Sequence, residues 1–182
     1  MRTKRRKSAS RRSTGAGEQI KVRGFFRIHI VEDRDRRGRL LKRPRVVGDS
    51  GWRENLVVNL GFDQFLCQTL GGMAGSKTIS HMALGTGAAP AAADTSLSGE
   101  ITHATNSRKT VTPTTIASKT LQLAATYASA DSFITASANI SNVGLFNTST
   151  TSAGTIFAGN TYTSSALATN QNVNASYQIR FA

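Results

Sequence analysis

Hydrophobic and polar residues alternate along much of the chain, beginning at residues 19–31. In the segment QIKVRGFFRIHIV, one face holds Ile20, Val22, Phe26, Ile28 and Ile30, and the other holds Lys21, Arg23, Arg27 and His29. A period of two is typical of a strand with one buried face, because successive side chains of a strand point to opposite sides. We therefore predict a β-strand over residues 19–31.

A second strand is predicted to return beside the first and to complete a β-hairpin over residues 20–47. The charged stretch EDRDRRGR, which contains Gly38, has the composition of a turn, and the segment LLKRPRVV follows it. Pro44 has no N–H to donate to a neighbouring strand, so we expect this second strand at an edge of the sheet. The expected product is a hairpin with a long, basic tip.

Residues 52–71 break the alternation and predict one short α-helix near residues 59–70. Apolar or small residues recur there at steps of three and four, the spacing of one helix face, at Leu60, Phe62, Phe65, Leu66, Thr69 and Leu70. Asn59 can cap the start of the helix, and Gly71 and Gly72 can end it. Cys67 lies within this segment, so we expect it to pack in the core rather than to act as a nucleophile.

The alternation then returns in five further segments, with Gly, Asn and Ser between them. These segments span residues 78–84, 119–127, 141–147, 154–163 and 172–181. Strands at a spacing of about ten residues favour an antiparallel sandwich or barrel over a parallel α/β sheet. The predicted fold class is all-β: an antiparallel, jelly-roll-like β-sandwich with one short α-helix, formed as a single domain by residues 19–182.

The positive charge of the chain lies almost entirely in its first quarter. Residues 1–45 hold 17 Lys and Arg and four acids, which accounts for the whole net charge of +13. The first 18 residues are basic and almost devoid of apolar side chains, so they cannot bury enough surface to offset the entropy of ordering. We predict that residues 1–18 form a flexible basic N-terminal arm. Its cations are Arg2, Lys4, Arg5, Arg6, Lys7, Arg11 and Arg12.

The arm has several alternative roles. Its seven cations can neutralise phosphates and release counterions, which would give salt-sensitive, sequence-independent binding to nucleic acid. They can equally order on an acidic surface of a neighbouring protein subunit, or they can serve only to keep the protein in solution. No aromatic residue lies among them, so base stacking is not predicted.

The triplet Gly85-Thr86-Gly87 follows a predicted strand and raises the question of a phosphate-binding loop. Such a loop needs a lysine or further glycines and a helix whose N-terminus faces the phosphate. Here the segment AAPAAADTS follows, with a proline at position 90 and no lysine. We interpret Gly85, Thr86 and Gly87 as a structural loop at which the chain turns out of the sheet.

The remaining candidate chemistry predicts no catalytic or metal site and no cofactor. The three histidines, His29, His81 and His103, have no metal-ligand spacing and are expected at surfaces or interfaces. The six carboxylates beyond residue 45 give no reason to single out a glycosidase pair. With one cysteine the chain has no intramolecular disulfide, and no apolar run is long enough to predict a membrane span.

Three stretches of the chain, taken in order, resemble a group of small structural proteins of tailed bacteriophages. The stretches are WRENLVVNLGFDQFLCQTLGG, ISHMALGTGAAPAAADTSLSGEI and VGLFNTSTTSAGTIFAGNTYTSSALATNQNVNASYQIRF. In that group an Asn-Leu-Val segment opens a short helix, a strand runs into a Leu-Gly-Thr-Gly loop, and a Val-Gly-Leu-Phe strand precedes a closing hairpin. The resemblance covers residues 52–181. The arm and the basic hairpin at 20–47 are not part of the pattern, and we interpret them as the parts through which this member attaches.

The resemblance implies a non-enzymatic virion protein, made in the host cytoplasm and placed in the head, the neck or the tail and fibre. Its partners would be copies of itself and other virion proteins. Residues 132–179 contain no charged side chain, which suits subunit interfaces, so we expect a homo-oligomer. The basic arm would anchor the protein to the particle.

Two alternative functions stay open. The first is a capsid shell subunit whose basic arm binds packaged nucleic acid. The second is a carbohydrate-binding appendage module, which would need aromatic residues grouped at a loop end. Trp52, Tyr127 and Tyr162 are too dispersed in the sequence to predict such a sugar platform.

Overall fold

The computed structural model describes residues 21–35, 37–102, 107–151 and 153–182, so the predicted arm lies outside the described residues. The described part is mostly β-structure with one short helical segment, which confirms the predicted all-β class. Its strands are β1 (Val22–Arg34), β2 (Leu40–Asp49), β3 (Arg53–Val57), β4 (His81–Gly85), β5 (Lys109–Thr110), β6 (Thr112–Ala117), β7 (Thr120–Tyr127), β8 (Ala138–Phe146), β9 (Ile156–Leu167) and β10 (Asn172–Phe181). The helical segment consists of η1 (Gly61–Cys67) and α1 (Gln68–Leu70), and η2 (Ser129–Asp131) is a single 3-10 turn.

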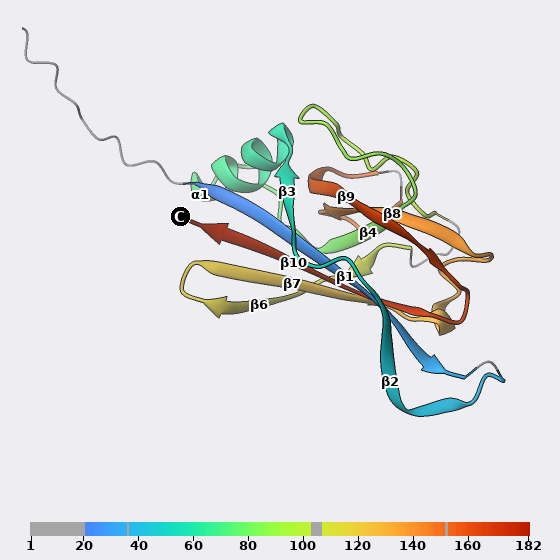
Figure 1. Cartoon of the computed structure of the whole chain (residues 1–182). Coiled ribbons are helices and arrows are strands. Elements are labelled where there is room, and N and C mark those ends of the chain that lie inside the picture. The colour runs from blue at the N-terminus through green and yellow to red at the C-terminus, as the bar shows by residue number, and fades with distance from the viewer. Residues whose placement is uncertain (1–20, 36, 103–106, 152) are drawn as a thin grey trace, which may run out of the picture.

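The strands pair into one antiparallel sheet that is nearly closed, so the molecule is barrel-like (Figure 1). The strand order is β5-β4-β8-β9-β3-β1-β10-β7-β6, and β2 pairs with β1 beside this path. The two ends of the order, β5 and β6, are separated in the chain only by Val111. This stretch pairs first with β4 and then with β7, and it thereby brings the two ends of the sheet together.

On the opposite side of the barrel, β3 joins the two halves of the sheet. Residues 53–55 pair with β1, and residues 56–57 pair with β9. The same edge of β1 continues into its antiparallel pairing with β2, so β1 and β2 form a hairpin in the region of the basic hairpin expected at 20–47. Within the described residues β2 pairs with no strand except β1, so Pro44 lies on an edge strand as predicted.

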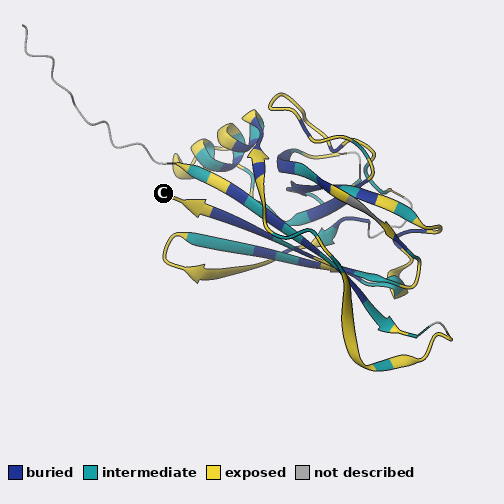
Figure 2. Ribbon diagram, viewed as in Figure 1, coloured by how far each residue is buried: buried dark blue, intermediate teal, exposed yellow. Residues whose placement is uncertain are grey.

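The core is filled by alternate residues of the strands. In β1, Phe26, Ile28 and Ile30 are each no more than 5% exposed, as the alternation predicted (Figure 2). Tyr127 of β7 is fully buried, and its hydroxyl donates to the carbonyl oxygen of Met82 in β4 at 2.6 Å. This bond satisfies a buried polar group and ties together two strands from opposite halves of the sheet.

A second, smaller apolar cluster lies where a loop covers the outer face of the sheet. Leu97 of this loop packs there with Val58, Ala83, Phe146 and Ile156. Because both faces are covered, residues 142–146 of β8 are all buried and the alternation of that strand is lost. The uncharged Val-Gly-Leu-Phe run therefore reflects a strand without a solvent face.

Three strands were not predicted, namely β3, β5 and β6. In β6 every residue is exposed, so no apolar face marks the strand in the sequence. In β3 only Asn55 and Val57 are buried, and one of these is polar. Their strand conformation depends on pairing, of β3 with β1 and β9, of β5 with β4 and of β6 with β7, which local sequence does not reveal.

The helical segment lies at the predicted position but differs in its interior. Most of it is a π-helix, in which hydrogen bonds join residues five apart, so a spacing of three and four no longer marks one face. Phe65 is buried, whereas Phe62 is 43% and Leu70 is 87% exposed. Cys67 is exposed, and the expectation that it packs in the core is wrong. No side chain caps the start of the helix among the described residues, and Asn59 donates its backbone N–H to Ala92.

Candidate interaction surface

The β1–β2 ribbon, which we define as residues 30–35 and 37–47, projects beyond the barrel (Figure 1). Every residue of β2 is exposed or half-buried, including the apolar Leu40, Val46 and Val47 (Figure 2). The outer edge of β2 pairs with no described strand. A strand of this kind offers its edge and both of its faces to another molecule.

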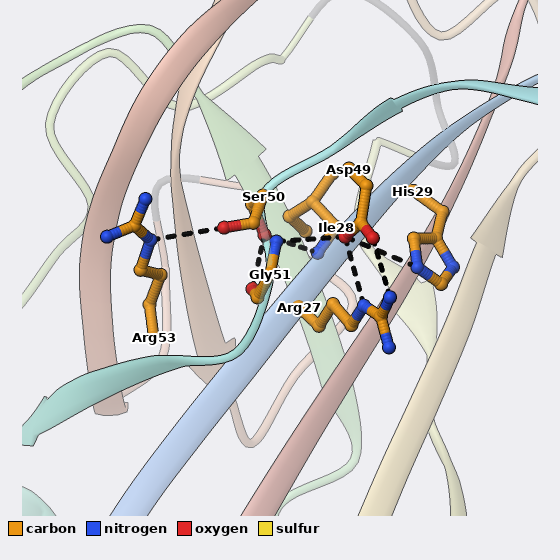
Figure 3. Close-up of polar contacts among 7 residues, drawn as sticks. All are labelled: Arg27, Ile28, His29, Asp49, Ser50, Gly51 and Arg53. Carbon is orange, nitrogen blue, oxygen red and sulfur yellow. Dashed lines mark hydrogen bonds and ion pairs between the residues drawn. The ribbon is translucent and has the colours of Figure 1, made fainter.

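The base of the ribbon is fixed by Asp49, the last residue of β2 (Figure 3). Arg27 of β1 donates to both carboxylate oxygens, at 2.9 Å to Oδ1 and 2.5 Å to Oδ2. The backbone N–H of Gly51 donates to Oδ1 at 2.8 Å, and Nε2 of His29 lies 3.4 Å from the same oxygen. The bond from Arg27, above all, holds the pKa of the Asp49 carboxyl well below its usual range.

Ser50 completes this junction between β2 and β3 (Figure 3). Its hydroxyl accepts the backbone N–H of Ile28 at 2.9 Å, and its own backbone N–H donates to the carbonyl of Ile28 at 3.0 Å. Arg53 donates from Nε to the carbonyl oxygen of Ser50 at 3.1 Å. The ribbon therefore leaves the barrel at a defined angle, because its base is bonded to β1 through side chains and backbone.

Farther out, two ion pairs hold the ribbon together. Arg45 Nη2 lies 2.6 Å from Glu32 Oε2, directly across the β1–β2 ladder. Gln171 donates to the other oxygen of Glu32 at 3.0 Å and so links the ribbon to the turn between β9 and β10. Near the tip, Arg39 pairs with Asp35 at 2.8 Å, and backbone bonds from the tip lower the pKa of Asp35.

Not all ribbon cations are paired. Among the described residues, Arg34, Arg37, Lys42 and Arg43 have no carboxylate within ion-pair distance, and Arg34 donates only to the carbonyl of Gly38. A hollow of about 420 Å³ lies in the ribbon and is lined by Glu32, Arg34, Asp35, Leu41, Arg43, Arg45 and Asn170. Among the described residues that line this polar hollow, three carry guanidinium groups and two carry carboxylates.

Exposed apolar side chains form further parts of the surface. Val46 and Val47 are followed along the chain by Trp52 and Leu56, which are 39% and 41% exposed. An apolar groove of about 280 Å³ lies against the helical segment, between Phe65 and Leu66 on one side and the strand residues Leu121 and Phe181 on the other. Large apolar side chains exposed beside a groove are typical of surfaces that contact other protein chains.

Gly85, Thr86 and Gly87 lie at the end of β4, remote from the ribbon in the strand order. A Cβ on Gly85 would overlap Oδ1 of Asn142, and a Cβ on Gly87 would overlap the backbone and hydroxyl of Ser98. Asn142 is fully buried, and its Nδ2 donates to the carbonyls of Ala88 and Ser98 at 3.1 and 2.8 Å. The glycines are therefore packed against the returning loop and leave no room for a phosphate group at their Cα atoms.

A buried ion pair that sequence analysis did not identify stabilises the neighbouring loops. Arg108 donates to both oxygens of Glu100, at 2.6 and 2.9 Å, and its Nη1 donates to the carbonyls of Thr148 and Ala153. Its guanidinium lies 3.6 Å from the centre of the Phe146 ring. The only signal in the sequence is an arginine in a region poor in charge, which does not reveal its partners.

The other candidate residues are not brought together. His29 lies at the ribbon base and His81 on β4, while His103 lies outside the described residues. Among the described residues no group of three His, Cys, Asp or Glu side chains could hold a metal ion. Tyr127 and Tyr162 are buried and only Trp52 is exposed, so these three aromatic residues do not form a surface platform.

Within the part of the chain that the structure describes, no helix has the length and apolar character needed to span a bilayer. The arm cations Arg2 to Arg12 lie outside that part. No protein-family model matches the chain, and no curated protein or solved structure is detectably similar to it.

Proposed function

We propose that this protein is a non-enzymatic structural component of a tailed-phage virion, as a head decoration, neck or tail and fibre attachment protein. The observation that carries the proposal is the β1–β2 ribbon: an edge strand with both faces exposed, held rigidly at its base by Asp49 and projecting from an otherwise nearly closed barrel. An exposed edge strand of this kind is suited to contact with neighbouring protein chains. The resemblance of residues 52–181 supplies the virion context.

A jelly-roll-like arrangement is part of the proposal. The β8–β9 pair is nested within the β7–β10 pair, since the chain passes from β7 through β8 and β9 before it returns to pair with β7. The β8–β9 pair lies in one half of the sheet and the β7–β10 pair in the other. This nested connectivity is the one expected of a jelly roll. In this view β3 and the β5–β6 stretch are the corners between two facing sheets.

Copies of the chain are proposed to meet through the exposed apolar surface. Val46, Val47 and Leu56 can be buried against a second copy, and the apolar groove beside the helical segment can accept such side chains. A contact between two different surfaces of the same chain closes into a ring when the rotation permits. The basic arm then anchors each subunit to the particle, and many weak contacts add up to stable attachment.

The first experiment asks whether the protein is present in phage particles and whether it self-associates. Particles purified from the host that carries the gene are analysed by mass spectrometry and labelled with antibodies against this chain. The purified full chain is analysed by light scattering after size exclusion, together with the double variant Val46→Thr, Val47→Thr. Ile116→Thr is the matched control, because Ile116 is also β-branched and 48% exposed but lies on β6.

We expect the protein in the particles and an oligomer in solution that the double variant weakens by at least tenfold in dissociation constant, while Ile116→Thr leaves it unchanged. Absence from the particles overturns the virion role. A wild-type chain that stays monomeric overturns the proposed self-association. Equal effects of the double variant and of Ile116→Thr would show that the ribbon is not the contact.

A further inference from the structure

We propose that the hollow of the β1–β2 ribbon binds a phosphate of a nucleic-acid backbone, which makes the ribbon a nucleic-acid contact separate from the N-terminal arm. The inference rests on the charges of the ribbon itself and not on the proposed virion role. The ribbon was predicted from sequence only as a basic hairpin, and no role in binding was assigned to its individual residues.

The hollow has an excess of positive charge that the ribbon does not neutralise internally. Arg34, Arg43 and Arg45 line it, together with two carboxylates. Glu32 pairs with Arg45 inside the hollow, whereas Asp35 pairs with Arg39, which is not a lining residue. Arg34 and Arg43 therefore keep guanidinium N–H groups for an incoming anion. The planar, forked guanidinium is suited to phosphate, which accepts two parallel hydrogen bonds.

The surroundings of the hollow favour nucleic acid over an acidic protein. Leu41 is the only apolar residue among the described residues that line it, so a partner that enters the hollow meets polar and charged groups and few of the apolar anchors on which protein interfaces depend. Arg37 and Lys42, which have no ion pair among the described residues, add further positive charge to the same ribbon. A two-stranded ribbon also has dimensions that the major groove of DNA admits.

A second copy of this chain does not fit the hollow as well. Most carboxylates of the described residues already hold cations of their own, as in the ion pairs of Asp49, Glu54, Glu100 and Asp131. A copy that contacts the apolar ribbon residues would therefore bring few free acids to the hollow itself. A polyanion from another source is the better complement.

The test measures the affinity of the full chain for random-sequence 30-base-pair DNA by fluorescence anisotropy between 50 and 200 mM salt. Because the arm would dominate binding, the measurements use a full chain whose seven arm cations are replaced by Gln. The ribbon variant of this chain carries Arg34→Gln and Arg43→Gln together. The matched control carries Lys77→Gln and Lys119→Gln, which remove the same charge far from the ribbon. Neither control lysine has an ion pair among the described residues.

We expect the ribbon variant to bind DNA roughly tenfold more weakly at 100 mM salt and to lower the slope of log K against log salt by about one, for the one phosphate contact that is lost. The lysine control should change the affinity less than twofold. Arg34→Lys with Arg43→Lys should restore most of the salt slope, and unchanged circular dichroism shows that the variants fold.

Equal binding of the ribbon variant and the lysine control overturns the inference, since only net charge would then matter. Equal competition by poly-glutamate and by DNA, compared at the same concentration of negative charge, also overturns it and assigns the hollow to acidic protein. Because DNA binding is measured on purified protein, either result leaves the search for the protein in particles unaffected, and the two proposals can fail separately.

Discussion

Arg108 and Glu100 form an ion pair inside the protein: Nε of Arg108 lies 2.6 Å from Oε1 of Glu100, and the two side chains are 0% and 5% exposed. The guanidinium also donates to two backbone carbonyls and lies over the Phe146 ring. Both residues lie between β4 and β5, and the bonds from Arg108 to the carbonyls of Thr148 and Ala153 connect this part of the chain to the loop between β8 and β9.

Breaking this pair should be strongly destabilising. Arg108→Met leaves the Glu100 carboxylate buried without its cation, a change that costs about 3–5 kcal/mol. Urea unfolding followed by circular dichroism measures the loss. The control is Lys109→Met, whose pair with Asp131 is partly exposed and should be worth no more than about 1 kcal/mol. Equal losses in the two variants would contradict the structural role of Arg108.

Asp49 should control the rigidity of the ribbon rather than that of the barrel. Asp49→Ala removes the acceptor for Arg27 and for the N–H of Gly51, so amide hydrogen exchange in β2 should become several-fold faster. Exchange in β10, which pairs with the other edge of β1, should stay slow. Glu54→Ala removes a more exposed pair with Arg23 and serves as the control. Faster exchange across the whole barrel would show that Asp49 supports more than the ribbon.

His81 should make the protein less stable in mild acid. Burial, and to a lesser degree the positive charge of Arg108, lower the pKa of His81, so the folded protein binds a proton less readily than the unfolded chain. This contribution is constant above about pH 6.5, the unfolded value, and stability falls as the pH drops from there toward the lower folded pKa. Thermal unfolding between pH 7.5 and 5.5 should show the decline in the wild type and in His29→Gln, and a smaller one in His81→Gln. If thermal stability falls equally with pH in the wild type and in His81→Gln, the decline does not come from His81.

Gly87 should tolerate no side chain. Gly87→Ala would drive a Cβ into the backbone of Ser98, and overpacking of this kind costs about 1–3 kcal/mol. Thr86→Ala is the control in the same triplet, because Thr86 is exposed and its hydroxyl makes only a long bond of 3.5 Å to Gly99. Chemical unfolding of both variants gives the comparison. A Gly87→Ala protein as stable as Thr86→Ala would show that the loop adjusts without cost.

For the candidate surface, the sequence predicted a basic hairpin but not which of its cations are free. Glu32 and Arg45 are 13 residues apart, and Arg27 and Asp49 are 22 apart, so their pairing follows from the register of β1 against β2. That register contains two irregularities, which periodicity cannot locate. The hollow and its unpaired arginines could therefore be identified only from the folded ribbon.

The sequence by itself determined the β-strands with one buried face, the hairpin at its start and the position of the helical segment. Such patterns are local, because alternation along a strand fixes the side to which each residue points, as in β1 and β10. The tertiary structure alone decided the closure of the barrel through β3 and the β5–β6 stretch, the exposure of Cys67 and the burial of Arg108. These features depend on contacts between segments that are distant in the chain. The pattern of residues within one segment does not reveal the energies of such contacts.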